Sequence, residues 1–455
     1  MSNNSRKMDR LEFLKIMGAA AAVTASATSC AGTSNKKKAE DNEANQMTYR
    51  TSTKGDKLSM LGYGCLRWPL VENAPAGTNV IDQDAMDELV DYAIEHGVNY
   101  FDTAPPYLQG WSEESIGRSL SRYPRDKFYI GTKLSTQKIT DRDESIEMYH
   151  RSFERLRVDY IDYYMLHSVG RTMSSFNERF LDNGVLDFLI EERKAGRIRN
   201  LGWSFHGNQE TFDQIVALHE TVHWDFVLIQ LNYSDWRNAR GANVNAEYLN
   251  AELEKRGIQV IVMEPLLAGR LSKLPPYIVE RLQEREPEKS VASWAFRFSA
   301  THPNVLCVLS GMTYMEHLKE NLATYSPLVP LDENEIEFLN QTAELILEYP
   351  TIDCNDCDYC MPCPYGLDIP GIFVHYNKCV NEGNVVSSTA DEKYRKARRA
   401  FLVGYDRAIP TRRQADHCIG CQKCVEHCPQ AINIPQEIRR ISRYVEKLRR
   451  DTLGE

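Results

Sequence analysis

The chain has 455 residues and a formal net charge of −10 at pH 7. A chain of this length exceeds what a single small core fills, so two or three domains are expected. Its apolar fraction of 42% and its charged fraction of 26% are ordinary for a soluble globular protein. The net negative charge argues against general nucleic-acid binding, which needs a cationic surface to meet the phosphates.

Residues 1–30 are typical of an export signal. A basic start leads into an Ala-rich apolar run at residues 16–27, which is too short for a membrane-spanning helix. Residues 10–15 resemble a twin-arginine signal, with Leu11 in place of the second arginine. The run that ends at Cys30 resembles a lipoprotein cleavage box in which this cysteine would carry the lipid. We therefore expect an exported protein, either periplasmic or anchored through Cys30. An uncleaved tail on a cytoplasmic protein is the alternative.

Apolar runs that suit β-strands alternate with amphipathic helical patterns from residue 47 to 330, after a polar, charged tether at residues 31–46. Eight strands are expected, at residues 60–64, 99–102, 128–133, 160–166, 198–204, 226–231, 259–263 and 305–309. Helical patterns lie between them, for example at residues 86–95 and 144–156. Eight successive strand–helix units predict a (β/α)8 barrel. A doubly wound sheet is the alternative, although no Gly-x-Gly-x-x-Gly turn follows the first strand.

A connecting helix is expected within residues 331–350, at 332–348, before a second domain at residues 351–455. That domain carries helical patterns at residues 370–378 and 391–404, which separate two groups of cysteines, and it ends in a basic helix. The basic residues of this last helix are expected on a solvated face.

Eight of the twelve cysteines lie in two short runs of the second domain. They are Cys354, Cys357, Cys360 and Cys363 in the first run, and Cys418, Cys421, Cys424 and Cys428 in the second. The second run has the C-x2-C-x2-C-x3-C-P spacing with which ferredoxins hold [4Fe–4S] clusters, because thiolates three residues apart on a tight loop point at three irons. The first run has one residue fewer before its Cys-Pro. The two runs together predict two [4Fe–4S] clusters.

The fourth cysteine of each run is expected to bind the cluster of the other run, as in two-cluster ferredoxins. The predicted ligand sets are Cys354, Cys357 and Cys360 with Cys428, and Cys418, Cys421 and Cys424 with Cys363. A zinc site usually shows paired C-x2-C knuckles or histidines, and a disulfide framework is typical of short secreted chains, so both alternatives fit less well. Outside the runs, Cys65 and Cys307 suit core thiols, and Cys379 suits a structural role or a substitute ligand.

Polar side chains stand where three consecutive strands of the predicted barrel end, at the face where such barrels carry their chemistry. Asp102 and Tyr107 follow the second strand in the run Asp-Thr-Ala-Pro-Pro-Tyr, Lys133 ends the third, and His167 ends the fourth after Leu166. These residues resemble the catalytic tetrad of the aldo-keto reductase superfamily, whose pattern is D-T-A-x-x-Y, a strand-end Lys, and then L-H. The resemblance covers most of the chain from residue 58 to 322.

The resemblance implies a role for each member of the tetrad. Tyr107 would donate a proton to a carbonyl oxygen as hydride arrives, although a free phenol has a pKa of about 10 and is a poor acid at neutral pH. The Lys133 ammonium is expected to lower the pKa of Tyr107, and Asp102 to hold that ammonium in place. His167 would orient the carbonyl oxygen by hydrogen bonding. Each residue alone could be a packing or surface residue; their order on consecutive strand ends favours an active site.

The resemblance also implies a nicotinamide cofactor. Ser204 and Gln230 would hold its carboxamide, Met263 stands where the family stacks an aromatic ring on the nicotinamide, and Glu320 and Asn321 belong to the last helix of the motif. The family's Asn after the serine is Phe205 here. The positions that correspond to the cations around the 2′-phosphate of NADPH hold glycine and histidine, Gly311 and His317. We therefore expect NAD(H) or NADP(H) without a strong NADPH preference.

The whole arrangement resembles aldo-keto reductases that carry a C-terminal ferredoxin-type domain. It implies an oxidoreductase that interconverts a small carbonyl and an alcohol by hydride transfer, with the two clusters relaying electrons to or from a redox partner protein. The basic last helix is a candidate surface for an acidic partner. Two alternatives remain. The clusters are structural in an ordinary reductase, or the barrel has lost turnover and the protein serves in electron transfer or binding.

Overall fold

The computed structural model of the chain describes residues 46–451, except 73, 75–77, 137–138, 170–171, 239–242, 349–350 and 387. The predicted signal at residues 1–30, the tether apart from its last residue, and Cys30 lie outside the described residues. Within the described ranges, no helix is both long enough and apolar enough to cross a membrane.

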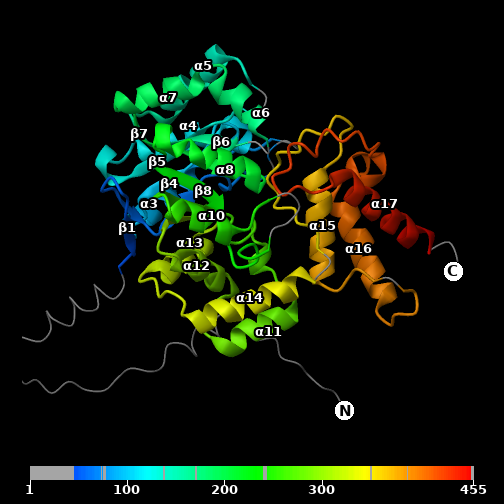
Figure 1. The fold of residues 1–455 in the computed structure, drawn as a ribbon. Helices are drawn as coiled ribbons and strands as arrows, with labels where there is room; N and C mark the ends of the chain where they lie inside the picture. The colour runs from blue at the N-terminus through cyan, green and yellow to red at the C-terminus, as the bar shows by residue number, and fades with distance from the viewer. Residues whose placement is uncertain are drawn as a thin grey trace, which may run out of the picture. The chain divides into compact units, whose positions relative to one another are not determined.

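Eight parallel strands form a closed barrel in the order β10-β3-β4-β5-β6-β7-β8-β9 (Figure 1). The strands are β3 (Leu61–Gly64), β4 (Tyr100–Asp102), β5 (Tyr129–Leu134), β6 (Ile161–Val169), β7 (Ile198–Phe205), β8 (Phe226–Gln230), β9 (Gln259–Met263) and β10 (Val305–Ser310). Each coincides with a predicted strand, and no end differs by more than three residues. The prediction of a (β/α)8 barrel is confirmed, and the closed topology excludes a doubly wound sheet.

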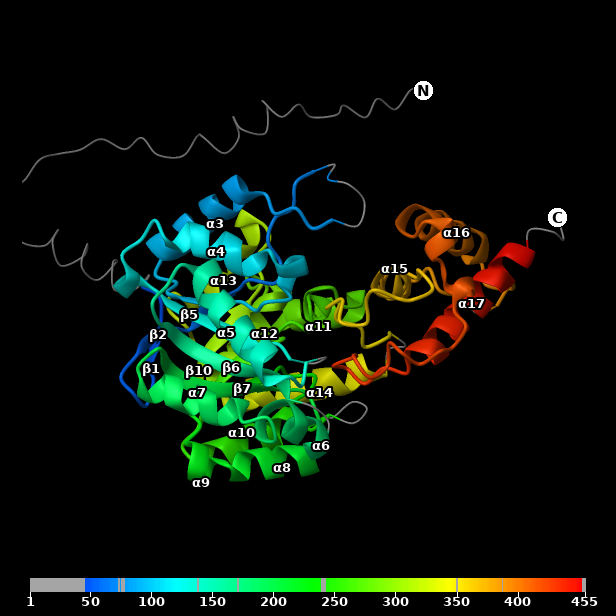
Figure 2. The same ribbon diagram turned by 90° about the horizontal axis from the view of Figure 1, so that it is seen from above.

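Helices cover the outside of the barrel strands, as the view from above shows (Figure 2). The longer ones are α3 (Gln83–Glu95), α4 (Ser112–Leu120), α5 (Arg142–Leu156), α7 (Val185–Lys194), α8 (Gln209–Ala217), α10 (Ala246–Glu254), α11 (Pro276–Arg285), α12 (Val291–Thr301) and α13 (Met315–Tyr325). Two single-turn helices, α6 (Met173–Phe176) and α9 (His219–Val222), lie between them. Side-chain caps define many of the starts; for example, Asp82, Asp141 and Asn208 each accept a hydrogen bond from a backbone N–H of the first turn.

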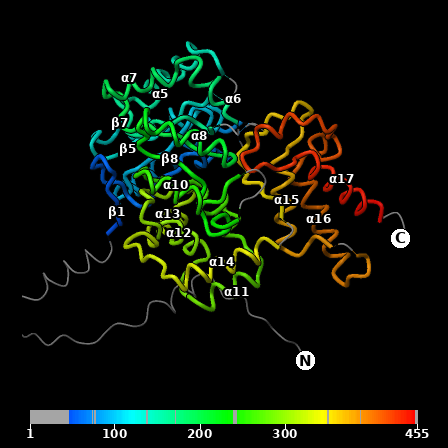
Figure 3. Tube along the Cα trace, in the orientation of Figure 1, coloured from blue at the N-terminus to red at the C-terminus, as the bar shows by residue number. Residues whose placement is uncertain are grey.

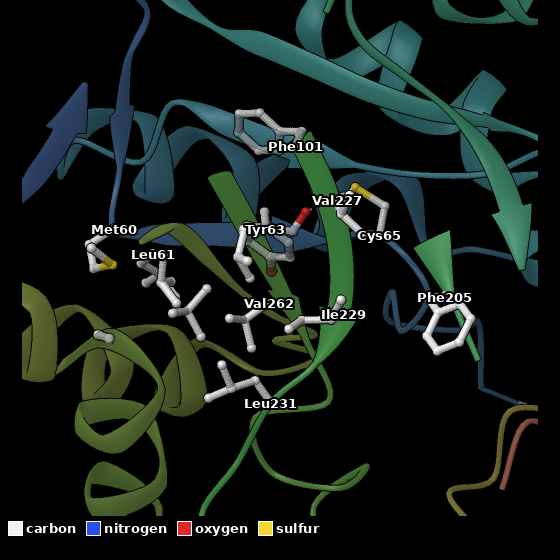
Figure 4. Close-up of a cluster of buried hydrophobic side chains, with 14 of the residues drawn as sticks. Met60, Leu61, Tyr63, Cys65, Phe101, Phe205, Val227, Ile229, Leu231 and Val262 are labelled. Atoms are coloured by element: carbon white, nitrogen blue, oxygen red, sulfur yellow. Dashed lines mark hydrogen bonds between the residues drawn. The ribbon is translucent and has the colours of Figure 1, made fainter. Parts of the chain in front are cut away.

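The alternation of side chains along the strands divides the buried residues into two layers. In β8, Val227 and Ile229 belong to the large cluster that also contains the apolar faces of the helices (Figure 4). Phe226 and Leu228, which alternate with Val227 and Ile229 along the strand, belong to a smaller cluster with Tyr163 and other strand residues. A period of two therefore sends one set of side chains inside the barrel and the other set under the helices.

A short antiparallel hairpin precedes the barrel and was not predicted from the sequence. Its strands are β1 (Tyr49–Thr51) and β2 (Lys57–Ser59). Arg50 on β1 donates to the backbone carbonyls of Ala300, His302 and Val305, so the hairpin lies at the start of β10. Strands of three residues are too short for a period of two to identify them.

The C-terminal part of the chain has a separate apolar core. After α14 (Glu333–Leu347), which begins with a capping box between Asp332 and Glu335, three helices pack around it: α15 (Ile369–Asn381), α16 (Tyr394–Ala408) and α17 (Ile434–Arg450) (Figure 3). Their core includes apolar residues of α17 at helical spacing: Ile434, Ile438, Ile441, Val445 and Leu448. Arg443 and other basic residues of α17 are exposed, as the predicted solvated face requires.

Candidate active site

Three of the predicted tetrad residues stand on neighbouring strands of the barrel. Asp102 ends β4, Lys133 lies in β5, and His167 lies in β6. Lys133 donates through Nζ to Oδ1 of Asp102 and, at 2.7 Å, to the carbonyl of Thr103. The Lys133 and Asp102 side chains are only 1% and 3% exposed, so this ion pair is shielded from water. Gly131 makes room for the hydroxyl of Tyr100, which donates to Asp102 at 3.4 Å, because a Cβ at that position would collide with this hydroxyl.

Tyr107 completes the group from the loop after β4, where a short 3₁₀ segment (Tyr107–Gly110) begins. Lys133 Nζ lies 4.9 Å from the centroid of the Tyr107 ring, and the rings of Tyr107 and His167 meet edge to face with centroids 6.1 Å apart. The structure therefore brings Asp102, Tyr107, Lys133 and His167 together.

Burial raises the pKa of Tyr107 well above its ordinary value, and the negative charge of Asp102 raises it further. The lowered pKa expected from the sequence is therefore wrong for the protein without a bound cofactor. The main reason is the burial of the phenol, and the Asp102 carboxylate that pairs with Lys133 raises the pKa further.

His167 is held as a neutral imidazole. Burial lowers its pKa well below the ordinary value, and the nearby charges of Lys133 and Arg179 lower it further. Its Nδ1 is 2.5 Å from the hydroxyl oxygen of Ser135, and Arg179 donates to the backbone carbonyl of His167 at 2.8 Å. Sequence reasoning missed Ser135 and Arg179, because neither belongs to a motif and the tertiary structure alone brings them to the histidine.

The remaining nitrogen of His167 faces the first cysteine run. Its Nε2 is 3.0 Å from the phenol oxygen of Tyr359, and the two rings meet edge to face with centroids 5.9 Å apart. The phenols of Tyr359 and Tyr107 also interact electrostatically. Tyr359 stands between Cys357 and Cys360 in the sequence, so the segment that carries predicted cluster ligands reaches the tetrad. Sequence reasoning missed this residue.

A buried carboxyl group lies beside these residues. Glu264 follows β9 with a positive φ of 56°, and its Oε1 accepts a hydrogen bond from Asn355 Nδ2 at 3.1 Å. Burial raises the pKa of Glu264 to about 7. Its Oε2 is buried without a hydrogen-bond partner among the described residues. Its charge acts on Tyr107 and Tyr359, so it belongs to the same electrostatic site.

The predicted cofactor residues fall into two groups. Ser204, Gln230 and Met263 lie on the adjacent strands β7, β8 and β9, and Gln230 is paired in register with Met263. The Ser204 hydroxyl accepts from the backbone N–H of Ser168 at 2.7 Å. The second group stands apart on α13, where Asn321 donates to the hydroxyl of Ser310 at 3.0 Å and Glu320 is exposed.

A nicotinamide carboxamide suits the surroundings of Gln230. This side chain lines a pocket that is open to solvent, together with Phe205, Asn243 and Gln430. The Oδ1 atom of Asn243 is buried without a hydrogen-bond partner among the described residues, so it could accept from an amide N–H. Gln230 itself accepts at Oε1 from Gln430 Nε2 at 2.9 Å. Gln430 lies two residues after Cys428, so the second cysteine run also reaches the barrel.

The cysteines of the two runs gather in two groups. The Cys357 thiol interacts electrostatically with Cys354 and Cys428, and Cys360 interacts with the same two and with Cys424. The Cys424 thiol interacts with Cys418, Cys421 and Cys363. Thiols within each predicted ligand set therefore interact with one another, including the exchanged Cys363 and Cys428, and Cys360 and Cys424 interact across the two sets. The donor chemistry fits two iron–sulfur clusters, because four thiols stand near one another in each group.

Two further observations concern the metal-ligating side chains of the described ranges. All cysteines in the described part of the chain are free thiols, so no disulfide framework is present there. Nor do three Cys, His, Asp or Glu side chains of the described ranges converge closely enough for a single metal ion. Each thiolate of a cubane binds its own iron, so the ligands of a cluster stand farther apart than those of one zinc ion. Cys379 stands outside both groups, buried in α15 with its sulfur 3.4 Å from His375 Nε2.

Comparison with known proteins identifies both parts of the chain. The profile of the Aldo/keto reductase family matches residues 61–344, well over half of the sequence. The chain belongs to this family. A second profile, described as a 4Fe-4S dicluster domain, matches residues 353–433, which contain all eight cysteines of the two runs.

The aldo/keto reductase relatives match part of the chain rather than its whole length. A soybean protein called probable aldo-keto reductase 1 is 30% identical over 50% of this chain and 61% of its own length. The NADH-specific methylglyoxal reductase of Escherichia coli is 24% identical over 64% of this chain and 96% of its own. A solved aldo-keto reductase from Klebsiella pneumoniae in complex with NADPH superimposes with a TM-score of 0.51, at 22% identity over 66% of this chain and 96% of its own. That structural likeness shows the fold. The chain spans about three-fifths of the length of the soybean relative.

Proposed function

We propose that this protein interconverts a small carbonyl and an alcohol by hydride transfer with a nicotinamide, and that its dicluster domain exchanges electrons with the barrel. The observation that carries the first part is the convergence of Asp102, Tyr107, Lys133 and His167 at the carboxyl ends of β4, β5 and β6. Membership of the aldo/keto reductase family supports it. A relative named for the reduction of methylglyoxal, a small carbonyl compound, is consistent with it.

Tyr107 serves as the proton donor in this proposal. Its raised pKa keeps the phenol protonated at neutral pH, so the proton is available until negative charge develops on the substrate oxygen. Lys133, 4.9 Å from the ring, would then stabilise the phenolate that remains, while Asp102 holds the ammonium in position.

His167 serves as the group that orients the substrate oxygen. A neutral imidazole carries one N–H, and the hydroxyl of Ser135 can donate to Nδ1 and so leave the proton on Nε2. His167 Nε2 and the Tyr107 hydroxyl would both donate to one oxygen. Two donors aimed at a single acceptor define where the carbonyl oxygen binds.

A bound nicotinamide would supply or accept the hydride. Gln230, Ser204 and Met263 are proposed to hold the ring, and Asn243 offers a further acceptor for its carboxamide. Glu320 and Asn321 remain candidates for the remainder of the dinucleotide. We propose that the protein has no strong preference for NADPH, because Gly311 and His317 supply no permanent cation at the positions that suit a 2′-phosphate. One relative is named as NADH-specific and one solved structure holds NADPH, so the family uses both.

The electron relay is the second part of the proposal. Oxidation of a nicotinamide releases two electrons and a proton, and two [4Fe–4S] clusters could take one electron each before passing them to a redox partner protein. Tyr359 and Gln430 support a direct connection, because each lies beside cluster cysteines and hydrogen-bonds to a barrel residue.

The test uses the holoprotein under anaerobic conditions. NADH and then NADPH are added, and cluster reduction is followed by loss of visible absorbance and by EPR. Reduced clusters support the relay and identify the nicotinamide, whereas clusters that respond to dithionite alone contradict it. Steady-state reduction of 4-nitrobenzaldehyde tests the barrel: a Tyr107→Phe variant that retains full activity would rule out Tyr107 as the proton donor.

Structural clusters in an ordinary reductase are the second candidate. Cysteines of both runs, Cys354 and Cys424 among them, pack against the apolar core of the C-terminal helices, so a cluster could stabilise that core. The third candidate is a barrel without turnover, which failure to bind either nicotinamide would support.

Export is a separate proposal, which rests on residues 1–30 alone. We propose that this segment directs the protein out of the cytoplasm and that Cys30 takes a lipid. Cell fractionation checks it, because recovery of a soluble cytoplasmic protein with residues 1–30 intact would contradict it. Metabolic labelling with palmitate tests the anchor against a Cys30→Ala control.

A further inference from the structure

Tyr359 holds the position that the proposed reaction assigns to the substrate. The two groups that would donate to a carbonyl oxygen are the Tyr107 hydroxyl and His167 Nε2. His167 Nε2 instead lies 3.0 Å from the phenol oxygen of Tyr359, and the Tyr107 phenol interacts electrostatically with the phenol of Tyr359. A single oxygen between these two groups is the arrangement that a bound carbonyl would adopt.

Barrel side chains hold the Tyr359 segment in place. Arg67 donates through Nη2 to the carbonyls of Asn355 and Asp356 at 3.0 and 3.3 Å. Asn355 in turn donates to Glu264 on the barrel at 3.1 Å. Arg270 pairs with Asp353 at 3.0 Å, just before the first cysteine. These contacts fix the backbone on the N-terminal side of Tyr359, so the phenol is directed into the site rather than lying there by chance.

We propose that Tyr359 is a built-in occupant of the substrate-oxygen position, and that substrate binds only when its hydroxyl is displaced. This inference rests on the proposed function, since it assumes that Tyr107 and His167 receive the substrate oxygen. An internal ligand lowers the apparent affinity for substrate by the fraction of molecules in which the site is free. Tyr359 therefore determines which substrates enter, because a weak carbonyl acceptor competes poorly against a tethered phenol.

The position of Tyr359 between two cluster cysteines gives the competition a second consequence. Displacing the phenol must move the segment from Cys357 to Cys360 or rotate the side chain out of the barrel. Substrate binding and the arrangement of the first cysteine run are thus coupled. By reciprocity, a change that holds this segment more firmly on the barrel weakens substrate binding to the same extent.

The hydroxyl and the ring of Tyr359 contribute separately. The ring packs edge to face on His167, a contact that phenylalanine would also make. The hydroxyl alone makes the hydrogen bond with His167 and the polar interaction with Tyr107 that compete with a substrate oxygen. Tyr359→Phe therefore removes the competing oxygen and keeps the packing, whereas Tyr359→Ala removes both.

The test measures binding to the full-length holoprotein rather than turnover. The probe is 4-nitrobenzoate, whose carboxylate offers an oxygen to Tyr107 and His167 but does not accept a hydride, and its Kd is measured by calorimetry with saturating oxidised nicotinamide. Tyr365→Ala is the matched control, because Tyr365 belongs to the same cysteine segment and is 48% exposed. Iron content and the EPR spectrum of each variant report whether the clusters are intact.

We expect Tyr359→Ala to bind 4-nitrobenzoate about tenfold more tightly than the wild type, because the competing hydroxyl and the ring that fills part of the site are both lost. Tyr359→Phe should show a gain of about threefold, since its ring still fills part of the site. Tyr365→Ala should match the wild type. Equal or weaker binding by Tyr359→Ala overturns the inference. If Tyr359→Ala loses its clusters, the binding of Tyr359→Phe is used in its place: tighter binding than the wild type supports the inference, and equal or weaker binding overturns it.

Failure of this inference and failure of the proposed function give different results. Tighter probe binding by the Tyr359 variants, with no reduction of 4-nitrobenzaldehyde by any form, would support the occupant and overturn carbonyl reduction. Turnover that depends on Tyr107, together with unchanged probe binding in both Tyr359 variants, would support the reductase and overturn the occupant.

Discussion

Gln430 donates to Gln230 at 2.9 Å and so joins the second cysteine run to the end of β8. Gln230 is the residue proposed to receive the nicotinamide carboxamide, and its own Nε2 donates to Asp235 at 2.5 Å. The acceptor oxygen that a carboxamide N–H would use is therefore already engaged by the dicluster domain. Together with Tyr359 on His167, this contact places one residue from each cysteine run in the barrel's candidate site.

Removal of Gln430 should strengthen nicotinamide binding. In Gln430→Ala the Gln230 Oε1 atom is free to accept from the carboxamide, and release from one hydrogen bond of about 1 kcal/mol corresponds to about fivefold tighter binding. The Kd of NADH and of NADPH, measured by quenching of protein fluorescence, checks this. Gln436→Ala, an exposed glutamine in the same domain, should leave both constants unchanged. Weaker binding by Gln430→Ala would show instead that Gln430 contributes to the cofactor site.

Loss of Lys133 should lower the stability of the barrel as well as its catalytic activity. Lys133→Met leaves the Asp102 carboxylate buried without its partner, which costs about 3–5 kcal/mol. The double variant Lys133→Met/Asp102→Leu removes both charges and should recover much of that loss, as thermal unfolding of the holoprotein would show. Arg151→Met, which breaks the exposed pair with Glu147, should lower the Tm little. A single variant as stable as the wild type would contradict the shielded ion pair.

Stability should fall as pH rises from about 4.5 to 7 because of Glu264. Its pKa is raised to about 7 in the folded protein from 4.5 in the unfolded chain. The carboxyl is therefore protonated in both states at low pH, and above pH 7 the fold must hold an ionised, buried group. The penalty grows through this window to about 3 kcal/mol and then stays constant.

Glu264→Gln isolates this contribution, because the amide keeps an acceptor for Asn355 and cannot ionise. Its Tm should match the wild type near pH 5 and exceed it at pH 8. A constant difference in Tm between the two proteins from pH 5 to 8 would show that Glu264 does not titrate in this range. Glu320→Gln, on an exposed carboxyl of α13, is the control and should follow the wild type.

Iron content should distinguish the cluster cysteines from the remaining one in the domain. Cys421→Ser removes a predicted ligand and should lower the iron content from about eight to about four atoms per chain. Cys379→Ser should keep the full complement, since Cys379 faces His375 within the helical core. Loss of iron in Cys379→Ser would make it a ligand. A folded Cys421→Ser protein that no longer exchanges electrons favours the relay, whereas an unfolded one favours structural clusters.

The sequence by itself determined the barrel and the residues at its strand ends. Strands buried on both faces have apolar runs as their sequence pattern, and each of the eight predicted runs forms a strand of the closed sheet. Asp102, Lys133 and His167 could be placed near one another because adjacent parallel strands end at one face. Cysteine spacing likewise predicted the grouping of the thiols, since the local loop geometry that a cluster needs is encoded in that spacing.

Only the tertiary structure decided what lies on top of those strand ends. Tyr359, Gln430 and Glu264 carry no motif, and their contacts join residues that are 192, 200 and 91 positions apart in the chain. The pKa of Tyr107 depended on the same packing, because burial and the charge of Asp102 both raise it. Local patterns report which face of an element is buried. They do not report which distant segment buries it, because that depends on how the two domains pack together.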